Sequence, residues 1–201
     1  MPFDLNEFRN NLQLGGARPS QFEMNINWPS GISLPADVAG ATSQVPFLCQ
    51  ISEIPGSTIG NFTIPYFGRK LHYAGDRIFD SLTITVINDE DFKIRQALEA
   101  WMAAVQHHGS ALSDYDGGQS AISGGTYVAD SIVIQYSRNQ AATGSGGAAI
   151  AKYRFVGMWP SILSPIALNW DSSDQIETYT CQFYYQWWES LNPSSETIAI
   201  A

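Results

Sequence analysis

Apolar and polar residues alternate with a period of two along much of the chain. The alternation is clearest in four segments, 21–28, 80–88, 131–136 and 177–189. Such a period is typical of β-strands with one buried face. The residues expected on the buried faces are Phe22, Met24, Ile26 and Trp28; Leu82, Ile84 and Val86; Ile132, Ile134 and Tyr136; and Tyr179, Cys181, Phe183, Tyr185 and Trp187. Shorter apolar runs at 46–54, 62–67, 151–159 and 164–170 are further strand candidates.

One segment has a helical period instead. Ile94, Leu98, Trp101, Met102 and Val105 recur at helical spacing within "DEDFKIRQALEAWMAAVQHHG". We expect a cap from the polar residue just before this segment, Asn88 or Asp89, followed by an acidic first turn that suits the positive end of the helix dipole. The helix is expected to end at Gly109.

The pattern as a whole predicts a mainly β protein, a sandwich or barrel of antiparallel strands with one flanking helix. Three stretches rich in glycine, serine and alanine, at 29–44, 109–125 and 139–149, are expected to be loops. A length of 201 residues is sufficient to bury a sizeable core, so we expect a single domain over 1–201.

The charge balance excludes several kinds of partner. The net charge is −9, and residues 155–201 contain five acids and no Lys or Arg, which argues against binding to the phosphate backbone of nucleic acids. Only 14% of the residues are charged while 12% are aromatic, a balance that indicates a surface covered in part by other subunits. No apolar run is long enough to cross a membrane, and no secretory signal is visible at the N-terminus. Cys49 and Cys181, each within an apolar run, are expected to be buried free thiols.

Candidate chemistry is sparse. His107 and His108 are adjacent, so on a helix they point about 100° apart and do not suit one metal ion. Asp171, Asp174 and Glu177 lie close enough in sequence to suggest a carboxylate pair for sugar hydrolysis, but acids also collect in solvated turns. No nucleophile elbow is present. A sugar-binding module using exposed aromatics such as Trp187 and Trp188 is a further possibility.

Two long blocks carry a resemblance. "GRKLHYAGDRIFDSLTITVINDEDFKIRQALEAW" combines a basic turn, an Ala-Gly-Asp-Arg corner, a Thr-rich strand and the single helix. "FVGMWPSILSPIALNWDSSDQIETYTCQFYYQWWE" supplies a closing hairpin, and "ARPSQFEMNI" and "FLCQISEIPGSTIGNFTIPYFGRK" agree in order. Together these segments strongly resemble the tail tube proteins of contractile-tailed bacteriophages of the T-even type.

The resemblance implies two packed antiparallel sheets whose inner sheets join into a continuous barrel in a hexameric ring. It implies stacking of rings into a tube through which DNA passes without specific binding, in a virion assembled in the host cytoplasm. The implied partners are the chain itself, the tail sheath protein, the baseplate and tail terminator proteins, and the tape-measure protein. Enzymatic activity, cofactors, metals and membrane insertion are not expected. An inner tube of a phage-like contractile injection system, pyocin-type or type VI secretion, is the alternative, because it has the same fold.

Two sets of site residues follow as expectations. The segment 56–76 is aromatic and carries a basic turn, so it is the candidate ring-stacking contact, with Asn61, Phe62, Tyr66, Phe67, Arg69 and Lys70 as its residues. Acids facing the lumen would repel DNA phosphates at short range. The candidates for that role are Asp76, Asp80, Asp130, Asp171, Asp174 and Glu177.

Overall fold

The structure is a computed structural model, and it describes residues 5–12, 16–29, 40–106, 127–137, 149–171 and 174–191. The expected loop at 109–125, most of those at 29–44 and 139–149, and His107, His108 and Gly109 lie outside these residues.

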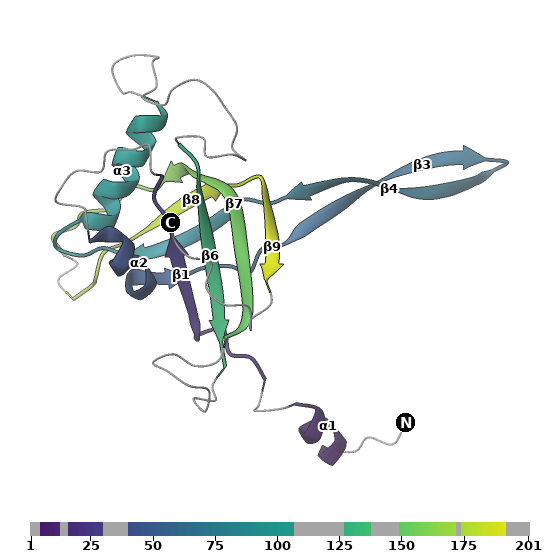
Figure 1. Cartoon of the computed structure of the whole chain (residues 1–201), viewed down its shortest axis with the longest axis horizontal. Coiled ribbons are helices and arrows are strands. Elements are labelled where there is room, and N and C mark those ends of the chain that lie inside the picture. The colour runs from purple at the N-terminus through teal and green to yellow at the C-terminus, as the bar shows by residue number, and fades with distance from the viewer. Residues whose placement is uncertain are drawn as a thin grey trace.

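The body is one continuous antiparallel sheet of seven strands, which strand β7 divides into two packed sheets (Figure 1). The first contains β1 (Phe22–Ile26), β6 (Ala129–Tyr136), the first part of β7 (Ala149–Leu163) and β9 (Trp187–Leu191). The second contains β2 (Cys49–Ile51), β5 (Leu82–Ile87), β8 (Thr178–Tyr184) and the last part of β7. The expected two-sheet antiparallel fold is confirmed.

Strand β7 belongs to both sheets. Residues 152–156 pair with β9, and this part of the strand also pairs with β6, whereas residues 159–163 pair with β8. Gly157 lies at the change of partner with φ +65°, a conformation that favours glycine. Its amide donates to Asp130 Oδ1 at 3.0 Å. A strand that bends at such a point allows one chain segment to make the corner between two packed sheets.

The core lies between the sheets and is covered by two helices. Met24, Ile84, Phe155 and Phe183 are fully buried strand residues of that core. Helix α3 (Lys93–Val105) contributes Ile94, Ala97, Leu98 and Trp101 to the core, and α2 (Ala41–Leu48) contributes Ala41 and Val45. A short helix α1 (Leu5–Asn11) lies on the N-terminal arm, away from the body in Figure 1.

The expected burial pattern is confirmed for β1, β5 and β8, but it is wrong for β6. There the buried face carries Ala129, Ser131 and Val133, while Ile132 and Ile134 are only partly buried on the outer face. The single strand expected at 177–189 is two strands, because β8 ends at Tyr184 and β9 begins at Trp187.

Four other expectations are wrong. Residues 46–48 continue helix α2 instead of beginning a strand, and 164–170 form neither strand nor helix. The described residues contain three helices in place of the single helix expected. Neither Asn88 nor Asp89 caps α3. The helix begins at Lys93 with Phe92 at φ +53° as its N-cap residue and no side-chain cap, so Asn88 and Asp89 lie too far before it to cap it. Asn88 Nδ2 donates to Glu177 Oε2 at 2.8 Å.

The remaining strands leave the body. β3 (Ser57–Tyr66) and β4 (Arg69–Phe79) form a two-stranded hairpin that projects far beyond the two sheets (Figure 1). It points away from the side on which α2 and α3 lie. A strand of eleven residues has a reach of roughly 35 Å.

Candidate functional site

The hairpin ends in a tight two-residue turn. Phe67 and Gly68 both have positive φ, +43° and +79°, as a type I′ turn requires. Phe67 is not a glycine, and its side chain is 91% exposed at the tip. A strained backbone that presents an exposed aromatic ring marks the tip as a candidate contact point.

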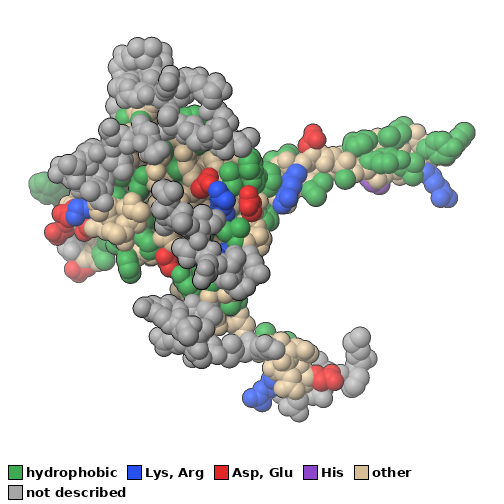
Figure 2. All heavy atoms as spheres, viewed as in Figure 1, with side chains coloured by type: hydrophobic (Ala, Val, Ile, Leu, Met, Phe, Trp, Pro, Cys, Tyr) green, Lys and Arg blue, Asp and Glu red, His purple; other side chains and the backbone are tan. Residues whose placement is uncertain are grey.

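The outer half of the hairpin has two different faces. On one face the opposed pairs are Phe62 with Tyr73, Ile64 with Leu71, and Tyr66 with Arg69. The Phe62 and Tyr73 rings stack with centroids 5.5 Å apart. We call these six residues the apolar face of the hairpin. The opposite face carries polar pairs, including Thr63 with His72. Every residue of the apolar face is exposed, and Figure 2 shows the hydrophobic side chains along the projection.

Contacts with the body hold the base of the hairpin. Trp188 Nε1 donates to the Gly56 carbonyl oxygen at 3.1 Å. The Arg77 guanidinium lies over the rings of Trp188 and Phe79, at 5.1 and 4.8 Å from their centroids. Half-way along, a Cβ at Gly75 would lie 3.2 Å from the Gly60 carbonyl group, so the two strands approach closely there.

The six expected ring-stacking residues all lie on this hairpin, but not on one surface. Phe62, Tyr66 and Arg69 belong to the apolar face, whereas Asn61 and Lys70 belong to the polar one. The sixth, Phe67, is at the tip. The apolar face also includes Ile64, Leu71 and Tyr73, which the sequence expectation did not contain.

The six acids expected in the lumen lie in three separate places. Asp76 and Asp80 are exposed on and just after β4. Asp130 on β6 accepts from Arg154 and from the Gly157 amide, so it is part of the structure of the bent strand. The last three belong to one loop. They are Asp171, Asp174 and Glu177.

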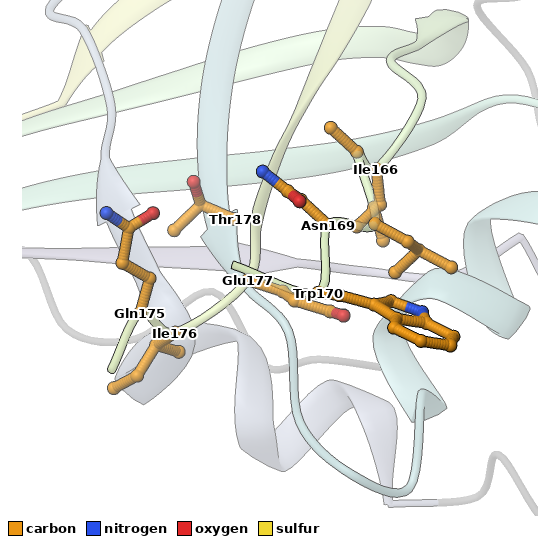
Figure 3. A pocket seen from close by; sticks show the side chains of 9 residues that line it. Ile166, Asn169, Trp170, Gln175, Ile176, Glu177 and Thr178 are labelled. Atoms are coloured by element: carbon orange, nitrogen blue, oxygen red, sulfur yellow. The ribbon is translucent and has the colours of Figure 1, made fainter. Parts of the chain in front are cut away.

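That loop, between β7 and β8, encloses a cavity of about 360 Å³ (Figure 3). Trp170 and Ile166 lie on one side of the cavity, and Gln175 and Ile176 lie on the other. Trp170 is fully exposed, Leu168 is 82% exposed and Ile176 is 75% exposed. The apolar run 164–170 contributes to this surface and not to a strand.

The base of the same loop is well anchored. The Ser164 amide donates to the Thr180 carbonyl at 2.9 Å, and the Thr180 amide donates to Ser164 Oγ at 2.8 Å. Arg95 on α3 donates to the Ser164 carbonyl at 2.7 Å and lies over the Tyr179 ring. The exposed side chains of the loop are therefore presented from a fixed base.

Other kinds of site find little support in the described residues. Among them, no three His, Cys, Asp or Glu side chains are grouped so as to hold a metal ion. Burial raises the pKa of both thiols, Cys49 and Cys181, from 9.0 to about 12, and both are free, as expected. Trp188 is engaged at the hairpin base by a hydrogen bond and a cation–π contact. No helix in the described part of the chain is both long and apolar enough to cross a bilayer.

Comparison with known proteins decides the family. The sequence model of the family described as "Phage tail tube protein" matches residues 17–191, which include both sheets, the hairpin and the loop. The chain belongs to the phage tail tube protein family. The family membership expected from the sequence resemblance is confirmed, and the protein is a structural component of the phage tail.

Individual relatives agree with the family. The tail tube protein gp19 of Enterobacteria phage T4 is 27% identical over 173 residues, covering 86% of this chain and 91% of gp19. The tail tube protein of Serratia phage KSP90 is 26% identical, covering 90% of this chain and 93% of its own. A chain in the cryo-EM structure of the anti-feeding prophage baseplate, 6-fold symmetrised, has the same fold, with a TM-score of 0.56 at 14% identity and coverage of 89% and 97%.

Sequence reasoning missed the cavity at Trp170. A signal was present, because "SPIALNW" carries a proline. A proline disfavours a central strand. The pattern left open whether the apolar side chains would be buried in the core or exposed.

Proposed function

We propose that this tail tube protein assembles into hexameric rings that stack into the inner tube of a contractile phage tail, and that the β3–β4 hairpin makes the contact between rings. The observation that carries the proposal is the apolar face of the hairpin, which projects from the body and is exposed among the described residues. A two-stranded hairpin is only marginally stable alone in water. Burial against a neighbouring copy would stabilise it.

The free energy available from this burial is substantial. Each large apolar side chain that becomes fully buried contributes about 1.5–3 kcal/mol. The apolar face and the tip provide six such side chains, at Phe62, Ile64, Tyr66, Phe67, Leu71 and Tyr73. Even partial burial of this set is enough to outweigh the cost of ordering a projecting hairpin.

The open sheet edges support ring formation. In the first sheet β1 and β9 are the outer strands, and each pairs with only one neighbour among the described residues. Unpaired strand edges tend to pair with other chains. Sheet edges joined around a cyclic axis would close into one barrel.

The test combines electron microscopy and size-exclusion chromatography of the purified chain at high concentration, with and without a preformed tube or baseplate seed. We expect stacked rings with a central channel. Deleting 61–67 should leave a folded body that no longer polymerises. A finer comparison replaces Phe62, Ile64 and Leu71 with Ser, against a control with Thr63→Ala and His72→Ala on the polar face. Unimpaired tubes from the deletion would overturn the role of the hairpin.

The lumen is proposed to be the passage for DNA, with carboxylates that repel phosphate. Asp76 and Asp80 are the variants to make first, because they are exposed and neither holds the fold together. Asp76→Lys and Asp80→Lys should slow DNA ejection from particles whose tubes still assemble. Equal ejection rates would contradict this assignment.

The sheath outside, the baseplate and terminator at the two ends, and a tape-measure protein inside the growing tube are proposed as further partners, and no catalytic role is proposed. The same fold in the anti-feeding prophage baseplate keeps a phage-like injection tube as the second candidate. The T4 and KSP90 relatives favour the phage tail.

A further inference from the structure

The β7–β8 loop exposes a second set of apolar side chains, apart from those of the hairpin. A cavity lined by both apolar and polar side chains lies open between Trp170 and Ile176, on a loop whose base is fixed by hydrogen bonds at Ser164 and Thr180. Large exposed apolar side chains in an anchored loop mark a binding surface more often than a solvated one. A partner that binds this surface must match both its apolar side chains and its charge.

The charges on and near the loop indicate what kind of partner would bind there. The loop lies beside the turn before α3, because the Asn88 amide donates to the Glu177 carbonyl at 2.8 Å and the two side chains are also hydrogen-bonded. Loop and turn together carry six carboxylates, and the nearby cations are Lys93 and Arg95. These two are paired, with Asp91 at 2.5 Å and Glu99 at 2.7 Å. The carboxylates are Asp89, Glu90, Asp91, Asp171, Asp174 and Glu177. An occupant with an apolar tip and flanking positive charge would fit.

The chain itself carries such a tip. Phe67 is exposed at the end of the hairpin, Arg69 follows it on the apolar face, and Lys70 follows on the polar face. Figure 2 shows the Lys and Arg side chains at the hairpin tip and acidic side chains at the other end of the molecule. One copy therefore presents a basic aromatic tip, and the same chain presents a cavity that is lined by Glu177 and lies on a loop that also carries Asp171 and Asp174.

The two features lie at opposite ends of the long axis (Figure 1), so one copy cannot satisfy both within itself. A contact between different patches, repeated from copy to copy, builds an open stack. We infer that the tip of the hairpin docks into the Trp170 cavity of a second copy, with Phe67 between Trp170 and Ile176 and with Arg69 and Lys70 facing the carboxylates of the loop. This inference rests on the proposed tube assembly and names the acceptor within it. It assigns Asp171, Asp174 and Glu177 to the contact between copies and not to the lumen.

The first test is cysteine crosslinking of the assembled full-length chain. Phe67→Cys combined with Ile176→Cys should give a ladder of disulfide-linked oligomers under mild oxidation. Cys49 and Cys181 are buried and do not compete. The matched control combines Phe67→Cys with Ile51→Cys, an exposed residue outside the cavity, and should give no ladder. Equal crosslinking in the two pairs, or none in the first, would overturn the docking.

The second test reverses charges on each side. Asp171→Lys with Asp174→Lys, and separately Arg69→Glu with Lys70→Glu, should each raise the concentration needed for polymerisation at least tenfold. A mixture of the two variants should restore the contact between unlike copies. Trp170→Ala should also weaken assembly, with its fold checked by circular dichroism.

The outcomes separate this inference from the proposed function. If hairpin variants abolish tubes while the loop variants and Trp170→Ala assemble normally, the hairpin has another acceptor and the inference fails alone. If the hairpin variants also assemble normally, the proposed ring-stacking role fails. If the loop variants form normal tubes but lose binding to sheath protein, the cavity belongs to the sheath and this inference is wrong.

Discussion

The Trp188 indole donates a hydrogen bond to the Gly56 carbonyl, so the last described strand of the body is tied to the start of the projecting hairpin. Arg77 lies over the same indole ring from the second strand of the hairpin. Both strands of the projection are therefore fixed to one side chain of β9.

Replacing this side chain should loosen the hairpin without unfolding the body. In Trp188→Ala, we expect amide exchange over 57–79 to become about thirtyfold faster, since a net hydrogen bond contributes about 1 kcal/mol and the cation–π contact a similar amount. Trp188→Phe keeps an aromatic ring under Arg77 and should give an intermediate rate. Hydrogen exchange read by mass spectrometry measures both, and unchanged exchange in Trp188→Ala would show that the base is held elsewhere.

Trp101 is the central aromatic residue of the core. It is fully buried, donates to the Tyr127 carbonyl at 2.6 Å and packs edge-on against Trp28 at 5.6 Å. Trp101→Ala should lower the free energy of unfolding by about 3–5 kcal/mol. The matched control is Trp170→Ala, which removes the same side chain from an exposed loop and should change stability by less than about 0.5 kcal/mol. Urea denaturation compares the two variants.

The bend in β7 depends on a positive φ at Gly157. An alanine there must adopt a left-handed conformation, at a cost of roughly 1–2 kcal/mol. Gly56→Ala is the control, because its φ is not positive and a Cβ there would meet nothing within 4 Å. The melting temperature of Gly157→Ala, measured by thermal unfolding, should be several degrees below that of the control. Equal melting temperatures would mean that the bend tolerates a side chain.

The buried thiols predict a fall in stability at alkaline pH. Burial raises the folded pKa of Cys49 and of Cys181 to about 12 from 9.0. The folded state then holds protons that the unfolded state releases, so the contribution is complete below pH 9 and is lost as pH rises toward 12. Each thiol adds a slope of up to about 1.4 kcal/mol per pH unit in this window. The double variant Cys49→Ala and Cys181→Ala should flatten the dependence between pH 9 and 10, measured by urea denaturation.

The sequence predicted the strands wherever alternation and burial agree. Leu82, Ile84 and Val86 alternate with threonines, and they are buried as expected. On β6 both faces carry apolar residues, and the pattern could not show that small Ser131 would be the fully buried one and Ile132 the outer one. Burial there depends on what packs opposite, which is a tertiary property.

The candidate site was located by the same reasoning only in part. The hairpin was found as an aromatic segment with a basic turn. Phe67 lies beside Arg69 and Lys70 in the sequence, so it was not expected to be buried in the core. The cavity at Trp170 was missed because an apolar run was assumed to be a buried strand. The loop shows that apolar side chains of such a run can lie exposed on an anchored loop instead of in the core.

Because β7 passes from one sheet into the other, the two halves of the body share a covalent backbone at Gly157. A mechanical load on β9 or β6 therefore reaches β8 through peptide bonds and does not rely on the side chains packed between the sheets. Sheets joined in this way resist sliding past each other, so the wall built from them would shorten or twist as one piece.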